Sequence, residues 1–279
     1  MFLSAFYIYL WVMIAVAIAT FITLYFVEAG YGILRTEKWG KTISNRWAWF
    51  FMELPIFLAM IILWLCSPHK WEDLTGNIAM VPMVFLIIFQ SHYLQRTLIF
   101  PFLLKGKSRM PIGIMCLGIA FNILNSAMQG YWLFYGAYST AADGYELMSN
   151  KFVRVMNEGG NWFLSWQFIS GICLFIAGYI INLRSDYIIR HLRKDPTDTK
   201  HYFPKGFMFN YVTSANYFGE LIEWLGFAIL TWTFSGFVFL IWTFANLVPR
   251  AHAIYKRYQK EFPEEMKNRN LKRVIPFIY

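Results

Sequence analysis

Charged residues are scarce in this sequence of 279 residues, in which Asp, Glu, Lys and Arg make up only 15%. Soluble domains carry about a quarter charged residues, so the composition argues against an ordinary water-soluble fold. Hydrophobic residues make up 58% of the chain, and aromatic residues make up 20%. Apolar stretches recur from end to end and leave no room for a separate soluble domain. We therefore interpret residues 1–279 as one integral membrane domain.

The sequence also lacks the signature motifs of soluble enzymes and of metal sites. Its three cysteines, Cys66, Cys116 and Cys173, form no CxxC pair, so neither a disulfide framework nor a zinc site is indicated. We expect these cysteines to act as small apolar packing residues. There is no GxGxxG after a strand, no GxxxxGK[ST], no HExxH and no GxSxG. These absences argue against a Rossmann or P-loop nucleotide site, a metal site and an α/β-hydrolase.

Long apolar runs are the main positive feature of the chain, since a helix needs about 20 residues to cross a bilayer. The first run is too long for a signal peptide and has no basic residue before it, so we predict a retained membrane helix. The sequence therefore predicts an all-α bundle of seven transmembrane helices. We place the seven helices at residues 2–27, 47–66, 77–104, 111–136, 161–182, 211–233 and 236–258.

Lysine and arginine are distributed unevenly among the connections between these runs. Alternate connections carry 21 basic residues on one side and three on the other. Cytosolic loops of membrane proteins are enriched in Lys and Arg, so we predict an outside or lumenal N-terminus and a cytosolic C-terminus. We attribute the net charge of +9 to this asymmetry and to attraction to anionic lipid. We do not expect nucleic-acid binding.

Polar side chains inside the predicted helices gather toward the cytosolic side. Glu53 interrupts the apolar stretch WAWFFMELPIFLAM, and a carboxylate at membrane depth is costly. Such groups usually line a protein interior or a watery cavity, so we predict a polar cavity open to the cytosol above an apolar floor. The other polar residues at this depth are His92, Tyr93, Arg96, Asn182, Asp186, Asn216, Glu220, Glu223, Arg250 and Tyr258.

The spacing of these residues supports a shared site but leaves simpler interpretations open. Asn182 and Asp186 are four residues apart, as are Asn216 and Glu220, so the members of each pair share one helix face. Simpler interpretations explain each residue separately: an Asp186–Arg190 pair, interhelical contacts by Glu220 or Glu223, packing by His92, and neutralisation of Glu53 by Arg96. These interpretations explain poorly why all the residues gather at one depth.

Several longer segments occur in an informative order. The chain has GYG at 30–32, AWFFMELPIF at 48–57, SHYLQRT at 91–97 and MQGYWLFY at 128–135. It continues with NLRSDYIIRHLRK at 182–194, GFMFNYVTSANYFGELIEWLGFAILTW at 206–232 and PRAHAIYKRY, and it ends with VIPFIY. Together these segments cover most of the chain, and in this order they resemble the steroid 5α-reductase family. The GELIEW segment favours the steroid-type branch over the related enoyl-CoA reductases.

The resemblance implies a seven-helix bundle that holds NADPH among its helices on the cytosolic side. The implied reaction is hydride transfer from the nicotinamide to C5 of a 3-oxo-Δ4 steroid, followed by protonation of C4. It also implies that Glu53 and Tyr93 serve the ketone oxygen, where negative charge develops. Removal from water favours the neutral form of a carboxyl group, so a buried Glu53 could donate a hydrogen bond there beside the Tyr93 hydroxyl.

The resemblance also implies a set of cofactor and substrate contacts. Guanidinium groups suit phosphates, so we expect a preference for NADPH over NADH and a phosphate contact from Arg96 or Arg193. Tyr31 and the basic loop 35–46 could cover the cofactor as a lid, and Trp224 could form a wall for a flat apolar steroid. The implied cofactor-binding residues are Tyr31, Arg96, Asn182, Asp186, Arg193, Tyr211, Asn216, Glu220, Arg250 and Tyr258.

Two positions depart from the family pattern. Met52 stands where many steroid-type members have Gln. Residues 253–255 are Ala-Ile-Tyr where the family has a His-rich run, and His252 is shifted relative to that run.

One alternative function is the reduction of another lipid enone, such as an enoyl thioester or a polyprenoid. Another is a transporter or receptor, although the sequence has no internal repeat. We expect a monomer in a bacterial inner membrane or an endoplasmic reticulum, with lipids and a lipophilic substrate as its partners.

Overall fold

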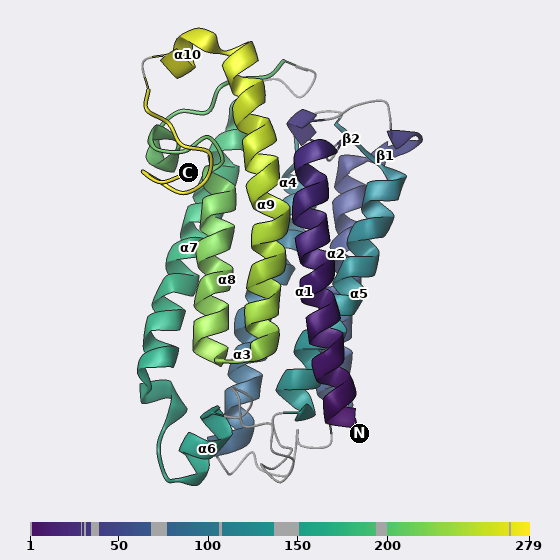
Figure 1. The fold of residues 1–279 in the computed structure, drawn as a ribbon, viewed down its shortest axis with the longest axis vertical. Helices are drawn as coiled ribbons and strands as arrows, with labels where there is room; N and C mark the ends of the chain where they lie inside the picture. Colours follow the sequence, from purple (N-terminus) through teal and green to yellow (C-terminus); the bar gives the residue numbers. More distant parts are fainter. Residues whose placement is uncertain are drawn as a thin grey trace.

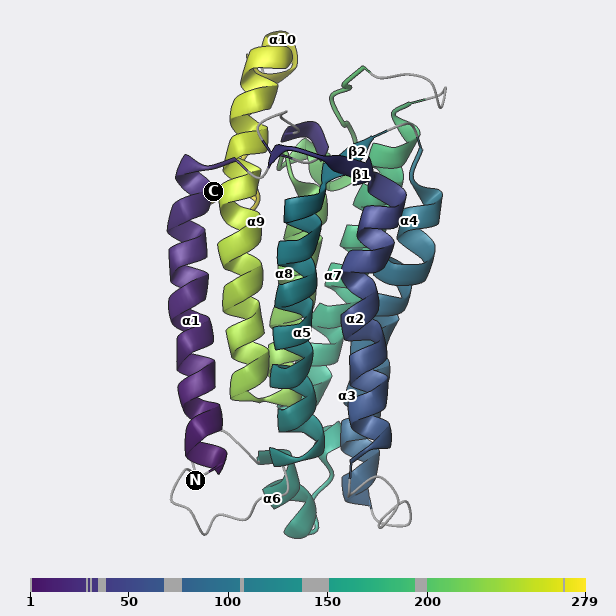
Figure 2. The ribbon, with the colours of Figure 1, turned by 90° about the vertical axis from the view of Figure 1, so that its right-hand side faces the viewer.

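Long helices that run along one axis make up most of this computed structural model (Figures 1 and 2). The structure describes residues 2–28, 30, 32–34, 39–67, 77–105, 108–136, 151–193, 200–267 and 269–279. Each of the seven predicted apolar runs overlaps one long helix. These helices are α1 (Phe2–Phe26), α2 (Asn45–Leu65), α3 (Asn77–Leu94), α5 (Ile112–Phe134), α7 (Trp166–His191), α8 (Ala215–Thr231) and α9 (Phe234–Glu261).

Six of these helices, counted over the described residues, are long and apolar enough to cross a membrane. The remaining one, α8, has 17 residues, which is shorter than the usual span of about 20. A multi-pass helical membrane protein is therefore confirmed, while the seventh crossing and the orientation stay predictions. Several helix bounds differ from those predicted, and one difference concerns the candidate site. The helix predicted at 161–182 continues in α7 to His191, so Asn182 and Asp186 both lie inside it.

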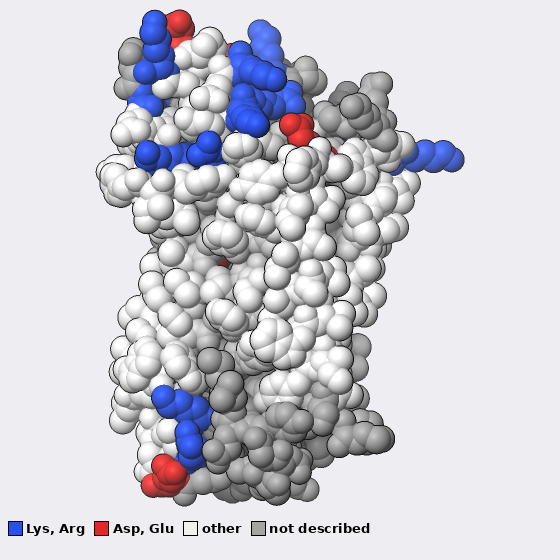
Figure 3. Space-filling view, viewed as in Figure 1, with Lys and Arg blue, Asp and Glu red and all other residues white. Residues whose placement is uncertain are grey.

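The surface has the charge pattern of a membrane protein. Figure 3 shows a broad band on this face that is almost free of charged residues, and Lys and Arg gather at the end that carries α10 (Pro263–Lys267). The C-terminus lies toward this end and the N-terminus lies at the opposite end (Figure 1). The uncharged band fits the hydrocarbon layer of a bilayer, from which charged groups are excluded.

Helices α7 and α8 approach each other unusually closely through glycines. Gly171 and Gly178 of α7 face Gly219 and Gly226 of α8, and a Cβ atom on any of the four would collide with backbone of the other helix. In each helix the two glycines are seven residues apart, which is about two turns. Small residues allow membrane helices to pack backbone to backbone, and this contact brings the polar residues of the two helices together.

A turn of π-helix interrupts the third membrane segment. Helix α3 passes into a π-helical turn, Gln95–Ile99, and then into α4 (Phe100–Leu103). The amide of Phe100 donates to the carbonyl oxygen of Gln95, five residues earlier, and Pro101 has no amide hydrogen to continue the regular ladder. A π-turn rotates the side chains that follow it, and such turns are frequent at functional sites. Here the turn contains Arg96.

A small sheet ties the starts of α2 and α5 together. Strand β1 (Thr42–Ser44) pairs antiparallel with β2 (Arg109–Pro111), with Ile43 opposite Met110. The Arg109 side chain adds a hydrogen bond from Nε to Thr42 Oγ1 at 2.8 Å. Because each strand leads directly into its helix, the sheet fixes α2 beside α5. Four further short helices are described: Gly32–Leu34, Lys151–Asn157, Trp162–Leu164 and Phe207–Asn210.

The largest apolar core fills the half of the bundle nearer the N-terminus. It contains Phe85 and Phe89 of α3, Trp132 of α5, and Trp224 and Phe227 of α8, all almost fully buried. In α8, which begins near the C-terminal end of the bundle, Asn216 and Glu220 precede this core and Trp224 enters it. A polar cavity open to the cytosol above an apolar floor was predicted. The described residues show polar side chains above an apolar core, and the cavity and its orientation stay predictions.

Candidate active site

Five polar side chains from three segments meet above the apolar core, and we call them the arginine cluster. Arg96 lies in the π-helical turn, Asn182 and Asp186 lie in α7, and Asn216 and Glu220 lie in α8. Arg96 Nη1 is 3.4 Å from Asp186 Oδ2, and Arg96 Nη2 is 3.6 Å from Glu220 Oε2. Asn216 donates to Asp186 Oδ1 at 3.2 Å, and Asn182 donates to Glu220 Oε2 at 3.4 Å. All five were predicted cofactor contacts.

The local sequence explains why these side chains converge. The two residues of each helix are four apart and share one face, and the glycine contacts press the two faces together. The guanidinium group of Arg96 lies 4.8 Å from the ring centres of both Trp49 and Phe100, which orient it by cation–π contact. Asp186 is ion-paired to Arg96. Arg190, its partner in one simpler interpretation, is within electrostatic range of Asp186, but the described residues show no ion pair between them.

Arg190 is a member of this neighbourhood that was not predicted as a site residue. It follows Asp186 by one turn of α7, and its guanidinium group lies 5.9 Å from the ring centre of Phe100. Its Nη1 atom is buried and has no hydrogen-bond partner within the described part of the chain. A buried guanidinium nitrogen without a partner is a donor suited to an anion.

Glu53 and Tyr93, the predicted catalytic residues, are both buried near the arginine cluster. Glu53 of α2 is 9% exposed and Tyr93 of α3 is 4% exposed. Asn122 of α5 donates from Nδ2 to Glu53 Oε2 at 3.0 Å. Each group is within electrostatic range of the other and of Arg96, although no direct hydrogen bond joins Glu53 to Tyr93 in the described structure. The sequence left open that Arg96 neutralises Glu53 directly. The described residues show no ion pair between the two, and Glu53 accepts a hydrogen bond from Asn122 instead.

Aromatic rings surround Tyr93 on its apolar side. Its ring centre lies 4.7 Å from that of Phe89 and 6.0 Å from that of Trp224. The Asn125 side chain also lies next to Tyr93 and is fully buried, yet neither of its amide atoms meets hydrogen-bond geometry with another described residue. Tyr93 is thus held mainly by packing, and the substrate contact predicted for Trp224 stays a prediction.

His92 and Glu223 form a buried pair beside this aromatic group. His92 Nδ1 and Glu223 Oε1 are 2.7 Å apart, and the two side chains are 5% and 0% exposed. The His92 ring lies 4.7 Å from Trp224. The pair joins α3 to α8, so the simpler interpretations of His92 as a packing residue and Glu223 as an interhelical contact are supported together. Sequence spacing could not reveal the pairing, because the two residues lie on different helices.

The other predicted site residues lie outside the arginine cluster. Arg250 is buried with its guanidinium group 5.3 Å from the ring centre of Tyr217, and Tyr258 packs on Phe203 and Phe262. Arg193 lies beyond the end of α7, where its Nε donates to the Lys200 carbonyl at 3.1 Å. Tyr211 is 45% exposed and contacts Phe277. Tyr31 and residues 35–38 of the predicted lid lie outside the described residues, whereas residues 42–44 of that loop form β1 and residues 45–46 begin α2.

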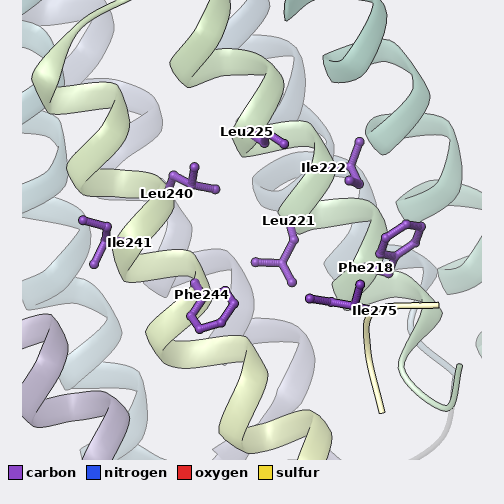
Figure 4. Close-up of a pocket in the computed structure, with 8 residues that line it drawn as sticks. All are labelled: Phe218, Leu221, Ile222, Leu225, Leu240, Ile241, Phe244 and Ile275. Atoms are coloured by element: carbon purple, nitrogen blue, oxygen red, sulfur yellow. The ribbon is translucent and has the colours of Figure 1, made fainter. Parts of the chain in front are cut away.

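A second feature, an apolar groove, lies on the other side of α8. Figure 4 shows side chains of α8, α9 and the C-terminal segment around this groove. Its volume is about 380 Å³. All eight lining side chains are hydrocarbon, so the groove offers no group that could bind a phosphate or a ribose. They are Phe218, Leu221, Ile222, Leu225, Leu240, Ile241, Phe244 and Ile275.

Comparison with known proteins places these features in a family context. The sequence profile described as 3-oxo-5-alpha-steroid 4-dehydrogenase matches residues 108–279. The chain is 36% identical over 268 residues to steroid 5-alpha-reductase DET2 of Arabidopsis thaliana, covering 93% of this chain and 91% of the relative. It is 34% identical over 270 residues to DET2 of Gossypium hirsutum, covering 95% and 93%. It is 33% identical over 262 residues to 3-oxo-5-alpha-steroid 4-dehydrogenase 1 of Mus musculus, covering 94% and 92%.

Proposed function

Because the chain belongs to the 3-oxo-5-alpha-steroid 4-dehydrogenase family, we propose that it reduces the Δ4 double bond of a 3-oxo-Δ4 steroid to the 5α product. It is an oxidoreductase of a membrane, and NADPH is the proposed electron donor. In this reaction C5 of the steroid accepts a hydride and C4 then accepts a proton. The ketone oxygen carries enolate charge in the transition state.

The observation that carries the proposal is the buried carboxyl group of Glu53 beside Tyr93. A donor aimed at the ketone oxygen lowers the barrier most when water is excluded, because the developing charge is then not screened. Glu53 in its neutral form and the Tyr93 hydroxyl are two such donors. The apolar rings packed around Tyr93, those of Phe89 and Trp224, are the proposed neighbours of the steroid ring system.

The arginine cluster is the proposed NADPH site, and its donor set suits that molecule. Asp186 and Glu220 would accept hydrogen bonds from ribose hydroxyls, while Asn182 and Asn216 would suit both hydroxyls and a carboxamide. The buried Nη1 atom of Arg190, which lacks a partner among the described residues, suits a phosphate oxygen. NADPH supplies the hydride when bound. The protein residues orient the cofactor, exclude water and stabilise the ketone oxygen.

The proposed topology has seven crossings, with the arginine cluster toward the cytosol. The gathering of Lys and Arg at one end of the molecule supports a cytosolic location for that end. Termini at opposite ends of the bundle (Figure 1) are expected for an odd number of crossings. Tags at both termini, tested for protease access in sealed vesicles, would report both features. Two termini on the same side would exclude seven crossings.

The function is tested by turnover of purified protein in detergent or nanodiscs. We expect loss of nicotinamide absorbance with NADPH and a 3-oxo-Δ4 steroid, and a product two mass units heavier than the substrate. Glu53→Ala provides the matched negative control. Robust oxidation of NADPH by an enoyl thioester, with none by the steroid, would instead assign the protein to another lipid enone. Equal kcat/KM values for NADPH and NADH would contradict the cofactor preference.

A further inference from the structure

Asn122 is the hydrogen-bond partner of Glu53, although the sequence did not single it out. It lies in α5, which packs along α2, and it is only 4% exposed. Its Nδ2 atom is 3.0 Å from Glu53 Oε2 and 2.7 Å from the carbonyl oxygen of Met52. We propose that Asn122 is a positioning residue for the reductase reaction and that it orients the Glu53 carboxyl group toward the substrate ketone. This inference rests on the proposed function.

The contact with Met52 determines which atom of the Asn122 amide, nitrogen or oxygen, points at α2. A backbone carbonyl oxygen can only accept a hydrogen bond, so the amide atom beside it must be the nitrogen and not the oxygen. The same nitrogen reaches Glu53 Oε2, so its two hydrogens are shared between the backbone and the carboxyl group. The amide orientation therefore follows from the chemistry of Met52 O and does not depend on the protonation state of Glu53.

This orientation decides which oxygen of Glu53 can serve the substrate. Because Oε2 accepts a hydrogen bond from Asn122, a proton on neutral Glu53 is carried by the other oxygen, Oε1. Oε1 is then the donor available to the ketone oxygen. Without Asn122 the carboxyl group could rotate and present either oxygen, with the proton on either one. A catalytic donor must be held within about 0.5 Å of its productive position, so this restriction should affect turnover.

A purely structural role is the competing explanation, because Asn122 also joins two helices. Gln129 is a suitable control for that role. It lies two turns further along α5, is fully buried, and donates from Nε2 to the Ser235 carbonyl oxygen at 2.9 Å. Asn122 and Gln129 therefore both link α5 to a neighbouring helix through a backbone carbonyl. Only Asn122 also contacts Glu53.

The first experiment compares Asn122→Leu with Gln129→Leu in the full-length protein. We expect Asn122→Leu to lower kcat by about 10–100-fold, the usual effect of removing a partner that orients a functional group. The dissociation constant for NADPH should change by less than about threefold, because Asn122 lies outside the arginine cluster. Both substitutions should lower the melting temperature by similar amounts, because each removes a link between two helices. Gln129→Leu should leave kcat unchanged in the folded fraction. Wild-type kcat in folded Asn122→Leu would overturn the inference.

The second experiment removes Glu53 first. In a Glu53→Ala background, Asn122→Leu should cause no further loss of turnover, because its effect passes through the missing carboxyl group. Losses that multiply would show that Asn122 acts on something else and would overturn the inference. Wild-type turnover of Glu53→Ala alone would instead contradict the proposed catalytic role of Glu53. Failure of the inference about Asn122 can therefore be distinguished from failure of the proposed function.

A second variant covers the case in which Asn122→Leu does not fold. Asn122→Ser is smaller and retains a hydroxyl group, but the hydroxyl has one hydrogen and cannot serve Met52 and Glu53 together. We expect the same separation between kcat and NADPH binding, and the same absence of effect in the Glu53→Ala background. A normal kcat in Asn122→Ser overturns the inference as clearly as it would in Asn122→Leu.

Discussion

The arginine cluster and the Glu53–Tyr93 pair lie close together but are held by different kinds of contact. In the cluster, Asp186 accepts hydrogen bonds from Arg96 and Asn216, while Glu220 is ion-paired with Arg96 and accepts a hydrogen bond from Asn182. Glu53 has no ion-pair partner among the described residues and accepts from one neutral amide. A buried charge depends on its counter-ion, whereas a group held by one amide can be removed with less disturbance. The comparison suggests that the cluster supports folding as well as binding, and that the pair mainly supports chemistry.

Loss of Arg96 should have the largest effect on the cluster. Arg96→Leu leaves the buried carboxylate of Asp186 and the partly buried carboxylate of Glu220 without their common cation. Breaking a buried ion pair by removing one partner costs about 3–5 kcal/mol, so we expect low yield and a much reduced melting temperature. The measurement is thermal unfolding in detergent. A stable Arg96→Leu protein would contradict the view that the cluster depends on this guanidinium group.

Loss of Glu53 should leave the fold intact and remove activity. Removing one donor to a developing oxyanion typically lowers kcat by about 100–1000-fold, or roughly 3–4 kcal/mol. We expect this loss in Glu53→Ala, with near-normal NADPH binding and a folded protein. Glu53→Gln keeps an N–H donor but has no acidic proton, so residual activity there would show that a neutral hydrogen bond is sufficient. An unfolded Glu53→Ala protein would show that Glu53, like Arg96, is needed for folding, and would contradict the difference between the two groups.

The glycine contact between α7 and α8 should matter for the cluster in particular. A methyl group at Gly178 would collide with the backbone of Glu223, and overpacking of this kind costs about 1–3 kcal/mol. We expect Gly178→Ala to lower the melting temperature and to weaken NADPH binding more than it changes kcat. Gly113→Ala is the control, since nothing lies within 4 Å of a Cβ atom there. Equal effects of the two substitutions would show that the close approach is not important.

The sequence predicted the broad arrangement because helix length, charge asymmetry and spacing are local properties. It located the polar residues of α7 and α8 on shared faces and placed an apolar floor below them. It missed Asn122 and Arg190 as functional candidates, because a partner on another helix depends on how the helices are rotated. That rotation depends on the π-helical turn at Gln95–Ile99 and on the α7–α8 glycine contact, and neither has a strong signal in a single sequence.

Loss of Arg190 should have a moderate effect that concerns the cofactor alone. Hydrogen bonds to charged groups contribute about 1.5–3 kcal/mol, so we expect Arg190→Leu to raise the KM for NADPH by roughly tenfold or more. Arg184→Leu, an exposed arginine of the same helix, is the control. If KM for NADH stays constant, the contact is to the 2′-phosphate. If both KM values rise, it is to the pyrophosphate. No change in either would exclude Arg190 from the cofactor site.

Filling the apolar groove should have the smallest effect, and it tests whether the substrate site lies on the inner side of α8. Leu240→Trp would occupy much of the space lined by Leu221 and Phe244. The groove has no donor for a ketone, so we expect kcat and the steroid KM to stay within about twofold, as for other substitutions away from functional groups. Leu117→Trp adds the same ring at a position that is 65% exposed, and it controls for the presence of another tryptophan at the lipid-facing surface. A tenfold rise in the steroid KM for Leu240→Trp alone would show that the steroid uses this groove. The two faces of α8 would then both belong to the functional site, because the polar face would bind the cofactor while the apolar face admitted the substrate.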